Sequence, residues 1–227
     1  MRITVNSHFP RRLSALSLSF CFAAAALLSG CASDKPASNA VFDFGNAMPA
    51  ATAAAVPAPL AAVVVTDVTG SAALDNERMY YRLNYADPLQ ARTYVNSRWS
   101  ATPLQLITQR LRTRVAQSGS KVLAPTDAAN GVPILRVEVD EFSHAFDGVA
   151  QSQGQLVLRA SLFQGHQLVD QKTFSRQSPA ASADAAGGAR ALATATDAAA
   201  ADIVAWLGTL ALAPVRAGVP AAPTAPK

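Results

Sequence analysis

The residues that carry most enzyme chemistry are few in this chain, and their spacing assembles no recognisable site. Of the three histidines, His8 lies in an apolar leader, and His144 and His166 do not form an i,i+4 ligand pair. The sequence contains neither a G-x-S-x-G nucleophile elbow nor a glycine-rich phosphate loop. We therefore predict a protein that is not an enzyme and that uses no metal or cofactor.

Three carboxylates, Glu138, Asp140 and Glu141, lie close together on one predicted strand. Two carboxylates can act as general acid and base when both point into one site. Here Glu138 and Asp140 share the face that strand alternation assigns to solvent, because the apolar residues of the strand occupy the other face. We interpret these carboxylates as a polar face of the sheet.

Cys31 follows the tripeptide Leu28-Ser29-Gly30, which is the pattern of a lipobox. Upstream, three arginines precede an apolar stretch at 13–28, as in a signal peptide. We predict cleavage before Cys31 and lipid on its thiol, and the alternative is an ordinary secreted chain. Because Cys21 leaves with the leader, no thiol then remains for a disulfide or a metal.

The residues after Cys31 bear on which membrane the protein reaches. Ala32 and Ser33 stand where an aspartate would resemble an inner-membrane retention signal, so we expect an outer-membrane anchor facing the periplasm. Three of the 19 basic residues and none of the 15 acidic ones lie in the leader, so the mature chain is close to neutral. A near-neutral chain has no basic stripe for phosphates, which excludes nucleic acid as a partner.

Aromatic residues are concentrated in one short stretch. All four tyrosines, Tyr80, Tyr81, Tyr85 and Tyr94, fall there, followed by Arg98 and Trp99. Tyrosine, tryptophan and arginine are enriched at binding hot spots, so the four tyrosines and Arg98 form a candidate partner interface. The alternative is that they fill the edge of the core. Tyr80 and Tyr81 must point to opposite faces of a strand, and we place Trp99 in the core.

Apolar periodicity predicts the elements that position these residues. A short strand is expected at 41–45, a buried strand at 60–68 closed by Thr69-Gly70, and an aromatic-rich strand at 79–84 that 86–88 breaks. After the first helix, three antiparallel strands are expected at 135–140, 156–162 and 168–176. A hairpin at 164–167 joins the last two.

Two amphipathic helices are predicted. The first begins with Thr102 as N-cap and Pro103 at the first turn, and it ends at Gly119. Its core stripe is Leu104, Ile107, Leu111 and Val115, with Gln109, Arg110, Arg112 and Arg114 mostly on the solvent side. The second runs over 184–210, is capped by Ser182 or Asp184, and buries Leu192, Ala195, Ala199, Ile203, Trp206 and Leu210. Its Gly187-Gly188 pair indicates either close packing on the sheet or a late helix start.

These elements predict an α+β fold, with an antiparallel sheet of about four to six strands and two main helices packed on it. We divide the chain into a lipoprotein signal peptide (1–30), a flexible tether and connector with a short strand (31–59), a periplasmic domain (60–212) and a disordered Pro/Ala-rich tail (213–227).

Several stretches, taken in order, resemble the ABC-type transport auxiliary lipoprotein family, which includes the lipoprotein subunit of the paraquat-inducible (Pqi) intermembrane transport system. They are 81–85, 97–99 with Pro103 opening a helix, 139–142 with 146–147, 173–174, 183–188 and 206–207. The segment 68–76 lacks the aromatic-rich character associated with the family, which puts a shared contact at that loop in doubt.

The resemblance implies a non-catalytic periplasmic subunit on the outer membrane. It implies docking onto a substrate-binding subunit with a mammalian cell entry (MCE) domain, in a system that moves lipids or hydrophobic compounds, and it leaves homo-oligomerisation open. Two other readings stay open from the residues alone: a structural or assembly lipoprotein of an outer-membrane complex, and an anchored hydrolase.

Overall fold

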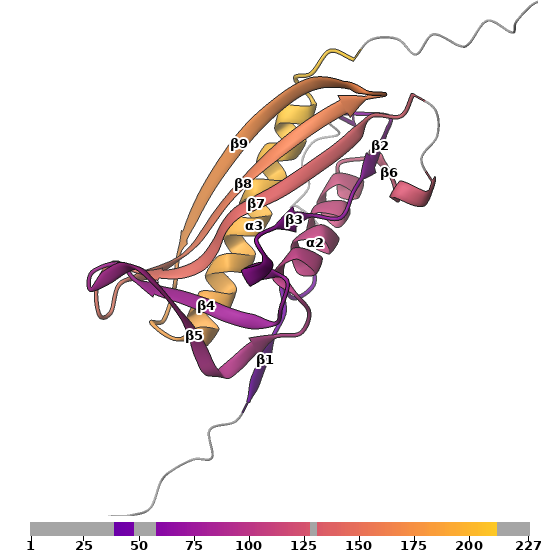
Figure 1. Cartoon of the computed structure of the whole chain (residues 1–227). Helices are drawn as coiled ribbons and strands as arrows, with labels where there is room; N and C mark the ends of the chain where they lie inside the picture. The colour runs from indigo at the N-terminus through magenta and orange to yellow at the C-terminus, as the bar shows by residue number, and fades with distance from the viewer. Residues whose placement is uncertain (1–38, 48–57, 128–130, 213–227) are drawn as a thin grey trace, which may run out of the picture. The chain divides into compact units, whose positions relative to one another are not determined.

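The computed structural model describes residues 39–47, 58–127 and 131–212. In these residues a nine-stranded sheet carries two α-helices on one of its faces (Figure 1). The predicted signal peptide, Cys31 with Ala32 and Ser33, and the C-terminal tail lie outside the described residues.

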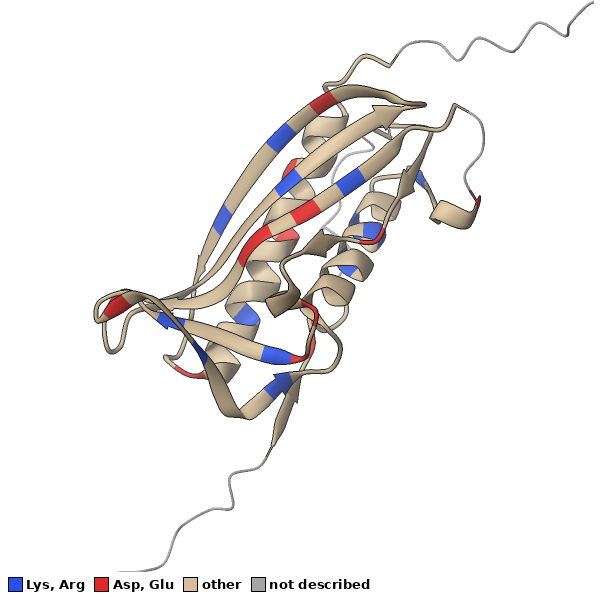
Figure 2. Cartoon of the chain, viewed as in Figure 1, with Lys and Arg blue, Asp and Glu red and all other residues tan. Residues whose placement is uncertain are grey.

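Three long strands form the antiparallel part of the sheet: β7 (Ile134–Phe146), β8 (Ser152–Gln164) and β9 (Gln167–Pro179). On β7, Leu135, Val137 and Val139 are buried and the carboxylates of Glu138 and Asp140 are exposed, as the alternation predicts. Gly165 makes the β8–β9 hairpin turn at a φ of 62°, a conformation that favours glycine. Figure 2 marks the charged residues along these strands.

The other edge of β7 pairs with strands that run parallel to it. These are β2 (Ala62–Val65), β3 (Thr69–Gly70) and β4 (Arg78–Leu83), and β6 (Lys121–Leu123) is parallel to β2. The expectation of an antiparallel sheet with four to six strands is therefore wrong, because the sheet is mixed. The physical reason is that a helical crossover separates β2 from β6 and β7, and such a connection brings strands side by side in the same direction.

Strand β5 (Asp87–Trp99) was not predicted from the sequence, which indicated a break at 86–88 and no further element before Thr102. It pairs antiparallel with β4, and β1 (Ala40–Phe42) runs parallel to it on its other side. Most of β5 is exposed, so it has no apolar alternation for a sequence pattern to reveal. Thr69-Gly70, expected to close a strand, is itself the short strand β3.

Helix α2 (Pro103–Gln117) begins as predicted, with a capping box. The Thr102 hydroxyl accepts a hydrogen bond from the Gln105 backbone N–H at 3.3 Å, and the Gln105 side chain accepts one from the Thr102 N–H at 3.2 Å. The solvent-side placement of Arg110 is wrong, since this side chain is 4% exposed. It donates to Asp197 and to the backbone carbonyls of Phe44 and Gly45.

Helix α3 (Ala185–Leu207) lies along β7, β8 and β9, and its buried stripe of Leu192, Ala195, Ala199, Ile203 and Trp206 is as predicted. The Asp184 carboxylate caps it by accepting from the Gly187 N–H at 2.7 Å. Leu210, placed in the helix by the sequence, follows its end and is half-buried.

A cluster of aromatic rings joins the N-terminal end of the described chain to its middle. Trp99 is buried, as predicted, and its ring centroid lies 5.6 Å from that of Phe44 and 5.7 Å from that of Phe142. Ser161 is buried and accepts a hydrogen bond from Gln171 at 2.8 Å. Among the described helices none is long and apolar enough to cross a membrane.

Candidate docking surface

The tyrosine-rich stretch forms a two-stranded antiparallel ribbon of β4 and β5, which continues the sheet beyond β7 (Figure 1). The ribbon is joined to the sheet where Tyr81, Arg82 and Leu83 pair with the last residues of β7. Arg82 also donates to Glu141 at 3.4 Å, so β7 holds the base of the ribbon by both backbone and side chain. The predicted interface residues therefore share one structural unit.

Tyr81 and Tyr94 point inward from this ribbon. Their ring centroids lie 4.7 Å apart, and the Tyr81 ring packs edge-on against Phe146 at 5.9 Å. The Tyr94 hydroxyl is 2.8 Å from Nδ1 of His144, and the two rings are stacked at 6.2 Å. For these two tyrosines, the contacts match the alternative in which they fill the edge of the core.

Burial changes the acid–base behaviour of the Tyr94–His144 pair. His144 is fully buried, and this desolvation lowers its pKa to about 4, with Asp184 acting weakly in the opposite direction. Burial also raises the pKa of Tyr94, to which the nearby Tyr81 and Asp184 add. Both groups are therefore neutral at physiological pH, as a buried hydrogen-bonded pair requires. His144 Nε2 has no hydrogen-bond partner among the described residues.

The other members of the predicted interface point away from this cluster. Tyr80, next to Tyr81 on β4, lies on the opposite face and is half-buried. Tyr85 stands in the β4–β5 turn and is 49% exposed. Arg98 is exposed near the end of β5 and pairs with Glu77. The structure thus separates Tyr81 and Tyr94, which pack, from Tyr80, Tyr85 and Arg98, which remain available for contact.

Two irregular stretches in β5 each expose an apolar side chain. The register with β4 shifts between Arg82 and Leu83, which leaves 88–90 with no β4 residue opposite. It shifts again between Arg78 and Tyr80, which places the four residues 94–97 opposite a single residue of β4. Such bulges redirect side chains. Leu89 lies in the first stretch and is 89% exposed, and Val95 lies in the second and is 93% exposed.

The β4–β5 turn lies beside the β7–β8 turn (Figure 1), and the Asn84 side-chain amide donates to Asp147 at 3.1 Å across the gap. Asp147 also accepts from Gln153 at 2.9 Å, so both turns are tied to the sheet. Val149, in the second turn, is 80% exposed. We call Tyr85, Leu89 and Val149 the ribbon tip.

Sequence reasoning did not identify Leu89, Val95 or Val149. Leu89 and Val95 depend on a strand that was not predicted and on bulges set by its pairing with β4. A weak signal existed for Val149, since it follows Asp147-Gly148, a dipeptide typical of turns, where an apolar residue has no core to enter.

In chemical terms, this surface can bind but shows no arrangement for catalysis. Exposed apolar side chains on a held backbone are typical of protein contact sites, where burying them on a partner is favourable. Within 39–47, 58–127 and 131–212, no group of three or more histidine, cysteine or acidic side chains is arranged to hold a metal ion.

Comparison with known proteins extends these observations. Residues 42–204 match the family model described as ABC-type transport auxiliary lipoprotein component. A crystal structure of a Xanthomonas campestris protein aligns with a TM-score of 0.57 at 19% identity, covering 64% of this chain and 82% of that one. The crystal structure of an uncharacterized protein aligns with a TM-score of 0.56 at 14% identity, covering 75% and 99%. At these identities the likeness shows the fold alone. No curated protein sequence matches.

Proposed function

The chain belongs to the ABC-type transport auxiliary lipoprotein family, and on this basis we propose that it is the lipid-anchored periplasmic subunit of a Pqi-type intermembrane transport system. In this role it docks onto the MCE-domain subunit of the transporter and catalyses no reaction itself. Lipids or hydrophobic compounds are the proposed cargo of the complete system. The observation that carries the proposal is the family match over 42–204, which spans both helices and most of the sheet.

The anchor in this proposal is a lipid on Cys31 in the outer membrane. The lipobox before Cys31 supports lipidation, and Ala32 and Ser33 support release from the inner membrane. Several acyl chains, at about 0.8 kcal/mol for each buried methylene, hold a protein on a membrane stably.

The docking surface in this proposal is the ribbon tip together with Tyr80, Val95 and Arg98. Three features support this choice: the apolar side chains are exposed, the two turns are cross-linked by the Asn84–Asp147 hydrogen bond, and Tyr81 and Tyr94 anchor the ribbon to the sheet. An anchored ribbon loses little conformational entropy on binding, so more of the contact energy contributes to affinity.

The experiment is site-specific photo-cross-linking in cells that carry the whole transport system. A photoreactive amino acid is placed at Leu89, and separately at Thr113, an exposed position on α2. We expect a cross-link from Leu89 to the MCE-domain subunit and none from Thr113. Cross-links from both positions, or from neither, would reject the ribbon tip as the docking surface.

Co-purification tests the functional class independently of the surface. The mature lipoprotein, extracted in mild detergent, is expected to carry the MCE-domain subunit with it. Recovery of an outer-membrane complex without that subunit would instead favour a structural or assembly role.

A further inference from the structure

Strand β9 forms one edge of the sheet. Within the described residues it pairs with β8 along its length and with no other strand. In an antiparallel edge strand, alternate backbone N–H and C=O groups point away from the sheet without a partner strand. β9 is 13 residues long and mostly exposed, so it offers a long unpaired row of these groups.

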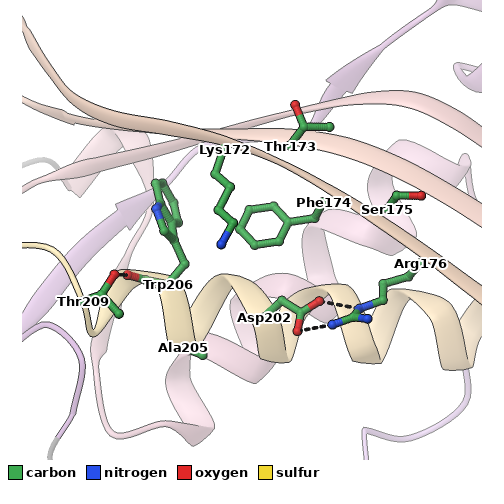
Figure 3. A pocket seen from close by; sticks show the side chains of 9 residues that line it. All are labelled: Lys172, Thr173, Phe174, Ser175, Arg176, Asp202, Ala205, Trp206 and Thr209. Atoms are coloured by element: carbon green, nitrogen blue, oxygen red, sulfur yellow. Dashed lines mark hydrogen bonds and ion pairs between the residues drawn. The ribbon is translucent and has the colours of Figure 1, made fainter.

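A hollow of about 420 Å³ lies against this edge, between β9 and the C-terminal end of α3 (Figure 3). Five consecutive β9 residues, 172–176, line it, together with Asp202, Ala205, Trp206 and Thr209. Lys172 and Phe174 point toward α3, whereas Thr173 and Ser175 point to the other side of the strand. Thr173 and Ser175 therefore contribute to the wall through the strand edge, which brings the unpaired backbone into the hollow.

The floor of the hollow is an ordered aromatic pair. The rings of Phe174 and Trp206 meet edge to face at 5.9 Å, and both residues are buried. The Trp206 indole N–H donates to Asp170 at 2.8 Å, which fixes the orientation of the ring. The Lys172 ammonium lies 5.5 Å from the centre of the Phe174 ring, so the lysine side chain partly covers this floor.

The charges of the hollow leave one cation without an acidic partner. Arg176 and Asp202 form a two-bond ion pair, seen as dashed lines in Figure 3, and so neutralise each other. Lys172 forms no ion pair with a carboxylate in the described part of the chain, and its contact there is with Phe174. The Asp170 carboxylate is held by the Trp206 indole, so the hollow combines an ammonium group that has no ion pair in the described residues with an aromatic floor.

We propose that β9 and this hollow bind an extended segment of a partner protein, which adds to the sheet as a further strand. Backbone hydrogen bonds to β9 provide the main attraction, and alternate side chains of the segment enter the hollow. Charge complementarity defines the segment: it carries a carboxylate that pairs with Lys172, next to an apolar side chain that covers Phe174 and Trp206.

Two other occupants fit the charge less well. A second copy of this chain would bring its own Lys172 and Arg176 to the same edge. The chain's own segment 213–227 contains four prolines, which cannot donate backbone hydrogen bonds, and its two ionisable side chains, Arg216 and Lys227, are basic.

The test uses the mature chain in detergent micelles and a fluorescent nine-residue peptide of alternating valine and threonine with one central glutamate. We expect saturable binding by fluorescence anisotropy, together with slower hydrogen exchange of β9 amides, because an added strand protects the edge. The same peptide N-methylated along one edge is expected to lose binding, whereas methylation along its other edge leaves binding intact.

Matched charge reversals test the role of Lys172. Lys172→Glu is expected to lower the affinity for the glutamate peptide by about tenfold. It is expected to raise the affinity for the same peptide with lysine in place of the glutamate. Lys121→Glu, the same change on the distant edge strand β6, should alter the affinity for neither peptide. Binding without protection of β9, or equal effects of the two variants, would overturn the proposal.

Two further outcomes would show that something other than a partner segment occupies the hollow. Deletion of 213–227 followed by much tighter peptide binding would identify the chain's own terminus as the resident segment. Binding of glycerol phosphate at the same site, with the peptide excluded, would identify a lipid headgroup and reject the added strand.

Discussion

Gly188 on α3 and His144 on β7 lie so close that no side chain fits between them. A Cβ placed on Gly188 would come 2.4 Å from Nδ1 and 2.7 Å from Cγ of the imidazole. Gly154 on β8 makes a similar approach, since a Cβ there would lie 2.5 Å from the backbone nitrogen of Leu192. These two glycines set the distance between α3 and the sheet, and they explain the Gly187-Gly188 pair as close packing.

Gly188→Ala is therefore expected to lower the free energy of unfolding by about 1–3 kcal/mol, the usual cost of overpacking. The loss occurs although alanine favours a helix by about 1 kcal/mol over glycine. Urea unfolding measures the change. Gly148→Ala is the control, because a Cβ there meets only the Gln151 side chain, at 3.6 Å. An unchanged or raised stability of Gly188→Ala would show that α3 sits farther from His144.

Stability should fall as the pH is lowered through the range in which only the unfolded chain protonates His144. The folded pKa is about 4, below the ordinary 6.5, so the unfolded state binds the proton first. Between pH 7 and pH 5 this difference costs about 2 kcal/mol. Above pH 6.5 the contribution of His144 is constant.

The histidine ring signal in an NMR titration checks this assignment. His144 should titrate near pH 4, and a midpoint near pH 6.5 would contradict the buried pair.

Arg110 and Arg112 lie two residues apart on α2 and should differ in their effect on stability. Arg110 is buried and holds Asp197 and two backbone carbonyls. The Arg112 side chain is 31% exposed and holds Asp67 and one backbone carbonyl, that of Val65. Arg110→Met is expected to cost about 3 kcal/mol, because it leaves the Phe44 and Gly45 carbonyls without a donor. Arg112→Met should cost less than half of that. Equal losses in thermal unfolding would contradict the buried role of Arg110.

The tyrosines should separate into two classes. Tyr81→Ala is expected to cost about 2 kcal/mol of stability, because it removes the ring that packs on Phe146 and Tyr94. Tyr85→Ala should change the free energy of unfolding by less than about 0.5 kcal/mol. It should weaken binding to the proposed MCE-domain partner by about 1 kcal/mol. Unfolding curves and binding titrations on the same two variants decide the point. A Tyr85→Ala variant that binds like wild type would remove Tyr85 from the docking surface.

Cys31→Ser tests the anchor. The variant should accumulate as an unprocessed precursor that incorporates no labelled fatty acid, because it lacks the thiol that we propose as the attachment point. Labelling equal to wild type would reject lipidation at Cys31. Membrane fractionation of the wild-type protein tests sorting separately. Mature protein in the inner membrane would contradict the sorting predicted from Ala32 and Ser33 and would leave the lipidation of Cys31 unaffected.

The parts of the fold that were predicted have a local signal in the sequence. Alternating apolar residues revealed β7 and β8, the hairpin at 164–167 indicated β9, and the Thr102-Pro103 start revealed α2. Strand β5 was not predicted, because its backbone pairs with β4 while most of its side chains are exposed to solvent. The burial of Arg110 was not predicted, because its carbonyl partners belong to Phe44 and Gly45. These residues are distant in the sequence, and no local pattern encodes such a contact.

For the candidate site, composition located the ribbon but could not orient its side chains. The tyrosine cluster is visible in the sequence, whereas the inward placement of Tyr81 and Tyr94 follows from the pairing of β4 with β7. Leu89 and Val95 became visible only with the two register shifts, because a bulge is a property of two strands together.

If Cys31 carries the proposed lipid, the pairing of β1 with β5 also limits how far the domain can move from the membrane. Ala40 is fixed beside Ser97, and a linker of eight residues, 32–39, joins it to Cys31. Even fully stretched, it reaches about 30 Å. The β1 end of the domain is then confined to a shallow layer above the bilayer, while the C-terminal end of α3 lies at the opposite end of the fold (Figure 1). A partner that contacts the β1 end must therefore reach that layer, and mutations that lengthen 32–39 should widen it.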